Sequence, residues 1–174
     1  YYDLGLRRSF LGGPMGCGRE HNQTAEYLRM IALATALEKC PLVAILRGIK
    51  PNEAIEIGDC LVEAGFALIE VPLNSPDALN SISKLANKFG HHAVIGAGTV
   101  LRCNEIEAVT NAGGQIIISP NTNIDVILKT KSLDLISMPG IATITEAFAA
   151  LEAGASALEL QDLSENMRMT RWAD

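Results

Sequence analysis

The chain has 174 residues, of which 48% are hydrophobic and 20% are charged, and this composition suits a single domain with a sizeable apolar core. Its formal net charge of -6 and the lack of a Lys/Arg run argue against a nucleic-acid surface. No apolar run reaches the roughly 18 residues needed to cross a bilayer, so we expect no membrane partner. Four cysteines without CxxC spacing or clustered histidines indicate free thiols in a reducing, cytoplasmic compartment.

The first part of the chain has no hydrophobic period. We expect residues 1–23, which are rich in Gly and include Arg7, Arg8 and Arg19, to form an unstructured or atypical N-terminal extension. This segment lacks the apolar block of a signal peptide. Residues 24–39 (TAEYLRMIALATALEK) have helical spacing and predict a helix ahead of the first strand.

From residue 42 onward, short apolar runs rich in β-branched residues recur every 20 to 26 residues. They predict six strands, at 42–47, 67–73, 93–97, 115–119, 135–138 and 157–160. The stretches between these runs have helical spacing. Within 51–64, for example, one helical face gathers Ala54, Ile57, Cys60, Leu61 and Ala64.

Helix ends are marked by residues with known end preferences. Thr143 and Glu146 have the spacing of a capping box, in which each side chain satisfies a backbone amide at the start of a helix. Gly65, Gly113 and Gly154 each follow a helical stretch, where a left-handed backbone conformation is favoured. The sequence therefore predicts a regular alternation of strands and helices.

Strands that are apolar on both faces and joined by helices indicate a parallel sheet covered by helices. Two architectures fit this α/β pattern, namely a doubly wound open sheet and a (β/α)₈ barrel. The chain supplies six strand–helix units rather than eight. In both architectures the functional site lies at the carboxyl ends of the strands, so polar residues at those ends are the candidates.

Several polar residues occupy such positions. Arg47 and Glu70 stand in otherwise apolar runs, Thr99 and Pro120 follow the third and fourth strands, and Glu159 lies within the sixth. A charged group in a buried strand costs roughly several kcal/mol of stability unless it is paired or takes part in binding or catalysis. The alternative to a functional role is a structural ion pair between Arg47 and Glu70 on neighbouring strands.

Two other features have plainer interpretations. The "GAGTV" segment at 96–100 lacks the third glycine and the following acid of a dinucleotide-binding fingerprint, so a dinucleotide site is a poor hypothesis. Its small residues are also explained by close packing at a barrel wall. His91 and His92 fall in the turn before the third strand, at the end of the sheet opposite to the candidate site.

Several segments taken together indicate a protein family more specifically than any one of them does alone. In order along the chain they are "LVAILRGIKPNEA", "GFALIEVPLNSP", "AVIGAGTVL", "ISPN" and "MPGIATITEAFAALEAGASALEL". Over about Pro41 to Leu160, this order and spacing resemble the family of 2-keto-3-deoxy-6-phosphogluconate, 2-keto-3-deoxy-6-phosphogalactonate and 4-hydroxy-2-oxoglutarate aldolases. The segments "LRGI" and "EVPLNSP" favour the galactonate branch, and hence carbohydrate metabolism and galactonate catabolism.

The resemblance implies a TIM barrel, usually assembled as a homotrimer, and a reversible class I aldol cleavage that needs no metal and no cofactor. The products are pyruvate and glyceraldehyde 3-phosphate, and a lysine on strand six forms the Schiff base. By resemblance, Glu70 is the general acid and base, Arg47 and Thr99 hold the pyruvyl carboxylate, and Pro120 shapes the pocket wall. These roles suit the chemistry, since a carboxylate shuttles protons and an arginine binds a planar carboxylate with two parallel bonds.

The chain departs from the family pattern at the nucleophile. Where the family has Ala-Leu-Lys, this sequence has Ala157, Leu158 and Glu159, and a carboxylate cannot form an imine. Residues 161–174 form a divergent tail, and strands seven and eight, which usually supply the phosphate site of such barrels, are not recognisable. We therefore expect a truncated, six-stranded partial barrel over residues 24–160.

Two hypotheses for function follow. The first is a lyase, an aldolase that cleaves 2-dehydro-3-deoxy-6-phosphogalactonate. The second is a catalytically inactive partial barrel that binds a keto acid such as pyruvate, or partner chains. Because an unclosed barrel exposes its first and last strands, we expect copies of the chain to associate.

Overall fold

The computed structural model describes residues 19–161, and their side chains from Tyr27 onward. The predicted extension therefore falls largely outside the described residues, as does the tail apart from Gln161. The elements are α1 (Arg19–Lys39), β1 (Ala44–Ile45), α2 (Ala54–Glu63), β2 (Leu68–Pro72), α3 (Ala78–Phe89), β3 (Val94–Gly98), α4 (Cys103–Asn111), β4 (Ile116–Ser119), α5 (Ile124–Ser132), β5 (Ile136–Ile141), α6 (Ile144–Glu152) and β6 (Glu159–Leu160).

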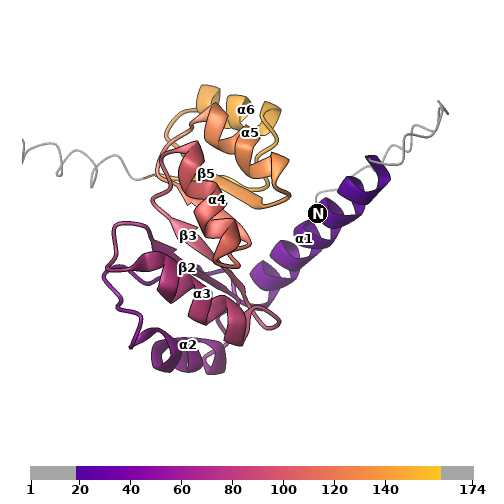
Figure 1. The fold of residues 1–174 in the computed structure, drawn as a ribbon. Coiled ribbons are helices and arrows are strands. Elements are labelled where there is room, and N and C mark those ends of the chain that lie inside the picture. The colour runs from indigo at the N-terminus through magenta and orange to yellow at the C-terminus, as the bar shows by residue number, and fades with distance from the viewer. Residues whose placement is uncertain (1–18, 162–174) are drawn as a thin grey trace, which may run out of the picture.

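The six strands form one parallel sheet in the order β1-β2-β3-β4-β5-β6 (Figure 1). This order has no switch point, which excludes the doubly wound alternative and confirms the partial barrel. Helices α2 to α6 cover one side of the sheet, because right-handed connections between strands in consecutive order all pass over the same face. Within the described residues β1 and β6 do not pair with each other, so the barrel is open there.

Alternation along each strand divides the apolar residues into two cores. On β2, Ile69 and Val71 point outward into the layer between the sheet and its helices. Leu68 instead points to the barrel interior, where it joins Val94 and Ile116 from the neighbouring strands. Because β2 to β5 are apolar on both faces, as the sequence predicts, these four strands are buried on both faces.

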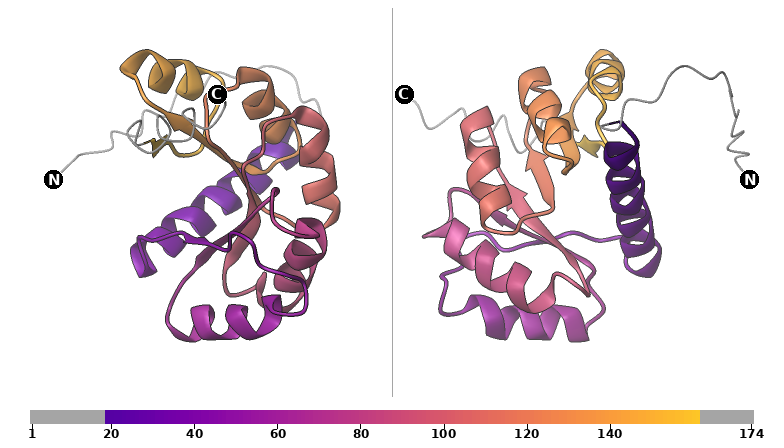
Figure 2. Two further views of the ribbon diagram at one scale, coloured as in Figure 1. Left: turned by 90° about the vertical axis from the view of Figure 1, so that its left-hand side faces the viewer. Right: turned by 45° about the vertical axis from the view of Figure 1, so that its right-hand side comes forward.

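Helix α1 closes the amino-terminal end of the interior. It lies on the side of the sheet away from α2, α3 and α4 (Figure 2). Its Leu33 and Ala36 are buried in the interior core, 3% and 5% exposed, against residues at the strand starts. The helix begins at Arg19, five residues before the predicted start at residue 24.

The predicted helix ends are confirmed. Thr143 Oγ1 accepts a hydrogen bond from the Glu146 amide (3.2 Å), and Glu146 Oε2 accepts one from the Thr143 amide (2.8 Å). Gly65, Gly113 and Gly154 have φ angles of +95°, +85° and +91°. These left-handed turns end α2, α4 and α6, and the chain then enters the next strand.

The predicted buried face of α2 is partly wrong. Ile57 is 39% exposed and Cys60 is also exposed, whereas Gly58 is buried. A Cβ atom at Gly58 would lie 2.5 Å from Phe89 Cε2 and 2.7 Å from Leu85 Cδ2. The absence of a side chain at Gly58 lets α3 approach closely there and rotates the buried face away from Ile57.

Two further sequence expectations concern the cysteines and the membrane. Cys40, Cys60 and Cys103 are free thiols, as predicted, and Cys17 lies outside the described residues. Across residues 19–161, no helix combines the length and apolarity that a membrane span needs.

Candidate functional site

A cavity of about 360 Å³ opens among the carboxyl ends of the strands. We call it the mouth cavity, and its lining residues are Val43, Ile45, Arg47, Glu70, Thr99, Ile118, Pro120, Met138, Leu158, Glu159 and Leu160. All five residues selected from the sequence, Arg47, Glu70, Thr99, Pro120 and Glu159, are in this lining. They come from different strands or the loops after them, so the sheet order itself brings them together.

Glu70 is the deepest ionisable group of the mouth cavity. It lies in the middle of β2 with only 5% of its surface exposed, and its Cα pairs in register with Gly96 of β3. Space for its carboxylate is made by Gly98, because a Cβ atom at Gly98 would overlap the Glu70 carboxyl group. Its Oε2 atom has no hydrogen-bond partner among the described residues.

Burial raises the pKa of the Glu70 carboxyl to about 7. The nearby Glu159 carboxylate contributes to this rise, whereas the Arg47 guanidinium and the Gly98 amide partly oppose it. A carboxyl with a pKa close to neutral exchanges protons readily at physiological pH, which is the property required of a general acid and base.

Glu159 lines the mouth cavity together with Glu70 and is close enough to raise its pKa. It is half-buried rather than enclosed in a strand, since β6 spans only two residues and its Leu160 is 78% exposed. Burial raises the pKa of the Glu159 carboxyl, and a hydrogen bond from Gln161 lowers it. The expectation of a fully buried sixth strand is therefore wrong, because this strand pairs with β5 alone in the described part of the chain.

Arg47 lies beyond the end of β1, and it is exposed rather than enclosed in the strand. Residues 19–161 contain no ion pair between Arg47 and Glu70, so the structural-pair alternative is wrong. The loop that carries Arg47 is fixed by Ser75, whose Oγ accepts a hydrogen bond from the Gly48 amide (3.0 Å) and donates one to the Leu46 carbonyl (3.5 Å). The backbone on either side of Arg47 is thereby fixed, and Arg47 lines the mouth cavity.

Thr99 and Pro120 complete the rim. Thr99 has a φ angle of +57°, a left-handed conformation that is unfavourable for a β-branched residue and is concentrated at functional sites. Pro120 lies after β4, against Gly140 of β5, where a Cβ atom would come within 2.6 Å of the Pro120 carbonyl oxygen. Thr122 Oγ1 also donates to the Gly140 carbonyl (2.8 Å), so this loop is tied to β5.

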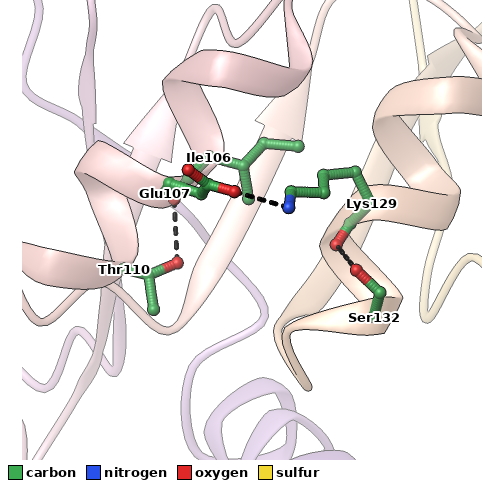
Figure 3. A network of polar contacts seen from close by, with 5 residues as sticks. All are labelled: Ile106, Glu107, Thr110, Lys129 and Ser132. Carbon is green, nitrogen blue, oxygen red and sulfur yellow. Dashed lines mark hydrogen bonds and ion pairs between the residues drawn. The ribbon is translucent and has the colours of Figure 1, made fainter.

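None of the six lysines of the chain, all within the described residues, lines the mouth cavity. Lys129 of α5 bonds Glu107 of α4 on the outer surface, with Nζ 2.6 Å from Oε1 (Figure 3). Lys88 is paired with Asp59 at 2.6 Å, and Lys84 donates to the Pro51 carbonyl. Lys50, in the loop after β1, is exposed. The cavity accordingly presents no amine that could act as a nucleophile.

His91 and His92 line a different cavity, of about 290 Å³, with Lys39 of α1. This cavity adjoins Ala93 and Val94, at the amino-terminal end of β3. The histidines therefore lie at the end of the sheet opposite to the mouth cavity, as the sequence predicts.

The apolar half of the mouth cavity and the glycine that shapes it were not predicted from the sequence. Ile118 and Met138 form part of the wall. Ile118 is two residues from Pro120, so the period of a strand was a usable signal. The role of Gly98 depends on which residue of β2 lies beside it, and a single sequence does not give that register.

Comparisons with known proteins agree with this geometry. The model of the family "Aldolase: KDPG and KHG aldolase" matches residues 33–165. The 2-dehydro-3-deoxy-6-phosphogalactonate aldolase of Escherichia coli K12 is 46% identical over 122 residues, which are 70% of this chain and 60% of that protein. The KHG/KDPG aldolase of the same organism is 32% identical over 115 residues, 66% of this chain and 53% of that protein.

Solved structures match over a similar range. The native KDPGal structure superposes with a TM-score of 0.69 at 46% identity, covering 70% of this chain and 59% of that one. The KDPG aldolase of Legionella pneumophila, with pyruvate captured as a covalent carbinolamine intermediate, gives a TM-score of 0.64 at 25% identity, covering 72% and 59%. The chain spans about three-fifths of the length of these relatives. By its family-model match and its fold, the chain belongs to the KDPG and KHG aldolase family.

Proposed function

We propose that the mouth cavity is the 2-keto acid site of an aldolase acting on 2-dehydro-3-deoxy-6-phosphogalactonate, and that this chain binds pyruvate there without forming a covalent intermediate. The observation that carries the proposal is the convergence of Arg47, Glu70, Thr99, Pro120 and Glu159 on one cavity. Two relatives that share 46% and 45% identity with the chain are named as a 2-dehydro-3-deoxy-6-phosphogalactonate aldolase and a probable one, which supports the choice of substrate.

In this proposal Arg47 and Thr99 bind the carboxylate of the keto acid. Arg47 is exposed at the mouth and unpaired with Glu70, so its two-pronged guanidinium is available to a planar carboxylate. The Thr99 side chain is presented from a strained backbone at the same rim. Pro120 closes the wall beside them.

Glu70 is the proposed proton carrier. Because its pKa is about 7, the carboxyl donates a hydrogen bond to the keto oxygen in its protonated form and accepts a proton in its ionised form. Its deep position places it beneath the carboxylate-binding residues. The proposed chemistry requires no metal and no cofactor.

In this proposal the chain does not carry out the covalent step of the family chemistry. A class I aldolase needs a lysine amine to attack the keto carbon, with loss of water, and to leave an iminium that withdraws electrons from the breaking bond. By resemblance Glu159 takes the position of that lysine, and none of the lysines lines the cavity. Binding without turnover is therefore the outcome that the cavity favours, and an active aldolase with a relocated nucleophile is the competing candidate.

Assembly is part of the proposal. A relative that is 44% identical to this chain, with a TM-score of 0.68, occurs in a porous cage designed by fusing symmetric oligomeric domains. We propose that this chain also forms a homo-oligomer, the family trimer being the expected form. The open edge of the sheet gives a further reason for copies to associate.

Borohydride reduction in the presence of pyruvate, followed by intact mass measurement, tests the covalent step. We expect no pyruvyl adduct on the chain as it stands, and an adduct on the Glu159→Lys variant, which provides the positive control. A stoichiometric adduct on the unmodified chain, mapped to any lysine, would establish an aldolase with a relocated nucleophile and overturn the non-covalent proposal.

Pyruvate binding itself is measured by calorimetry or by ligand-observed NMR. Arg47→Met should weaken binding by about tenfold or more, because a charge-assisted contact is lost. Arg102→Met is the matched control, since Arg102 is exposed at the start of α4 and does not line the cavity. Equal affinity of both variants for pyruvate would contradict the assignment of the carboxylate site.

A further inference from the structure

The mouth cavity has a charge pattern that a keto acid matches only in part. Among the described residues its lining has one cation, Arg47, and two carboxyl groups, Glu70 and Glu159. A 2-keto acid offers a single carboxylate and no positive group. Arg47 is sufficient to bind that carboxylate, and the two glutamates then face an uncharged carbonyl.

The state of Glu70 points independently to a missing partner. Its side chain is only 5% exposed, lines the cavity, and has an Oε2 atom without a hydrogen-bond partner in residues 19–161. Arg47 forms no ion pair with it. A buried carboxylate oxygen is costly to leave unbonded, so a hydrogen-bond donor in the cavity would be strongly stabilised there.

We infer that the mouth cavity selects a zwitterionic 2-amino acid with an apolar side chain over the corresponding 2-keto acid. The inference rests on the proposed function for one end of the ligand, because Arg47 and Thr99 still bind its carboxylate. The ammonium group replaces the keto oxygen and donates to Glu70 and Glu159. The single ammonium is then shared by the two carboxyl groups, and the carboxylate of the ligand is bound by Arg47.

The remaining lining residues determine which side chain the amino acid ligand can have. Val43, Ile118, Met138 and Leu158 supply apolar surface to the cavity. A volume of about 360 Å³ is sufficient for a small aliphatic amino acid. The wall has no charged group for an acidic or basic side chain, so alanine and its aliphatic analogues are the matching ligands.

The two ligand classes differ in their pH dependence. An ammonium is bound by ionised glutamates, so its affinity rises as pH increases through the pKa of Glu70, about 7. A keto oxygen needs the protonated form as donor, so its affinity falls over the same range. The charged groups facing Glu70 are Arg47 after β1 and Glu159 on β6, whereas β3 to β5 contribute Thr99, Pro120 and Met138, which do not titrate.

The experiment compares four probes on the full chain at pH 6 and pH 8: L-alanine, pyruvate, propionate and isopropylamine. Propionate has the carboxylate without the amine, and isopropylamine has the amine without the carboxylate. At pH 8 we expect L-alanine to bind at least about tenfold more tightly than either pyruvate or propionate, because its ammonium group makes one additional charge-assisted contact. Isopropylamine should bind weakly, because it does not engage Arg47.

Glu159→Gln is the informative variant, because it keeps the shape of the side chain and removes its charge. We expect it to lower the affinity for L-alanine by about tenfold and to leave propionate unchanged. Glu152→Gln, on the exposed surface of α6, is the control and should match the unmodified chain. Circular dichroism verifies folding, and Glu70→Gln provides a second, independent loss of charge.

The outcomes separate this inference from the proposed function. If pyruvate binds and L-alanine binds no more tightly than propionate, the inference is overturned and the keto acid site stands. If L-alanine binds and pyruvate does not, the inference is supported and the keto acid assignment is overturned. Binding of neither ligand overturns both, and unchanged L-alanine affinity in Glu159→Gln overturns the inference alone.

Discussion

Glu70 is a buried acid whose neighbours shift its pKa in opposite directions. Burial and Glu159 raise its pKa to about 7, and Arg47 and the Gly98 amide oppose the rise. The native state therefore binds this proton more tightly than the unfolded state, in which the carboxyl titrates near its ordinary value of 4.5. By linkage, the free energy of unfolding must fall as pH rises from about 4.5 to 7.

We therefore predict a pH-dependent effect of Glu70→Gln. The shift in the pKa of Glu70 corresponds to on the order of 3 kcal/mol of unfolding free energy. This contribution is present at low pH and is lost as pH rises through 7. Relative to the unmodified chain, the variant should gain stability between pH 5 and pH 8, as measured by urea unfolding. A difference between the two proteins that does not change with pH would contradict the raised pKa.

Gly98 gives a second prediction at this scale. A Cβ atom at this position overlaps the Glu70 carboxyl group, so Gly98→Ala should cost about 1–3 kcal/mol and also weaken pyruvate binding. Gly113→Ala is the matched control, because its φ of +85° makes alanine unfavourable far from the mouth cavity. If both variants bind pyruvate normally, Gly98 does not shape the site.

Residue types and positions in the sequence were sufficient to select the charged half of the site. Arg47, Glu70 and Glu159 could be selected because a charged residue within or just after an apolar strand is unusual, and strand ends converge in a parallel sheet. The exposure of Arg47 and the unpartnered oxygen of Glu70 could not be predicted. Both depend on side-chain packing between strands.

At the scale of elements, the role of α1 is defined by which of its residues are buried. Leu33 is 3% exposed against the interior core, whereas Leu28 on the same helix is 59% exposed. We predict that Leu33→Ala costs about 2–5 kcal/mol of unfolding free energy, since it leaves a cavity among strand residues. Leu28→Ala should change stability by less than about 0.5 kcal/mol, because it removes an exposed side chain.

Denaturant unfolding of both variants measures the comparison. Equal effects at the two positions would mean that α1 does not pack on the barrel interior.

The same helix shows why helix boundaries are hard to predict: residues 19–23 (REHNQ) are polar and add no hydrophobic period, yet they continue the helix. In α2 the pattern failed for a different reason, since a buried glycine, Gly58, contributes close packing without hydrophobicity.

At the scale of the whole molecule, the sheet formed by residues 19–161 has two open edges. Strands β1 and β6 each have one partner within residues 19–161, and Ile45 and Leu160 on them are 53% and 78% exposed. Unpaired edges with apolar side chains promote pairing with other chains. The order of the strands was predictable because each helical connection is short. The short length of β1 and β6 reflects the lack of a second neighbouring strand among residues 19–161.

We predict that the chain associates in a concentration-dependent way. Light scattering coupled to size exclusion should show species larger than a monomer at about 100 μM, and Leu160→Lys should reduce them, because a charged residue at an edge opposes pairing. Lys substitution of another exposed leucine, Leu101→Lys, is the control for added charge alone. A stable monomer at this concentration would contradict the prediction.

The consecutive strand order also has a consequence for how the chain folds. Each strand pairs with the next one along the chain, so every pairing closes a loop of roughly one strand–helix unit and can form in turn. Helix α1 is the exception, because it contacts β5 and its Arg29 donates to the Leu133 carbonyl, 104 residues away (3.4 Å). Docking of α1 is therefore the long-range step, and we expect it to follow assembly of the sheet and to limit the folding rate.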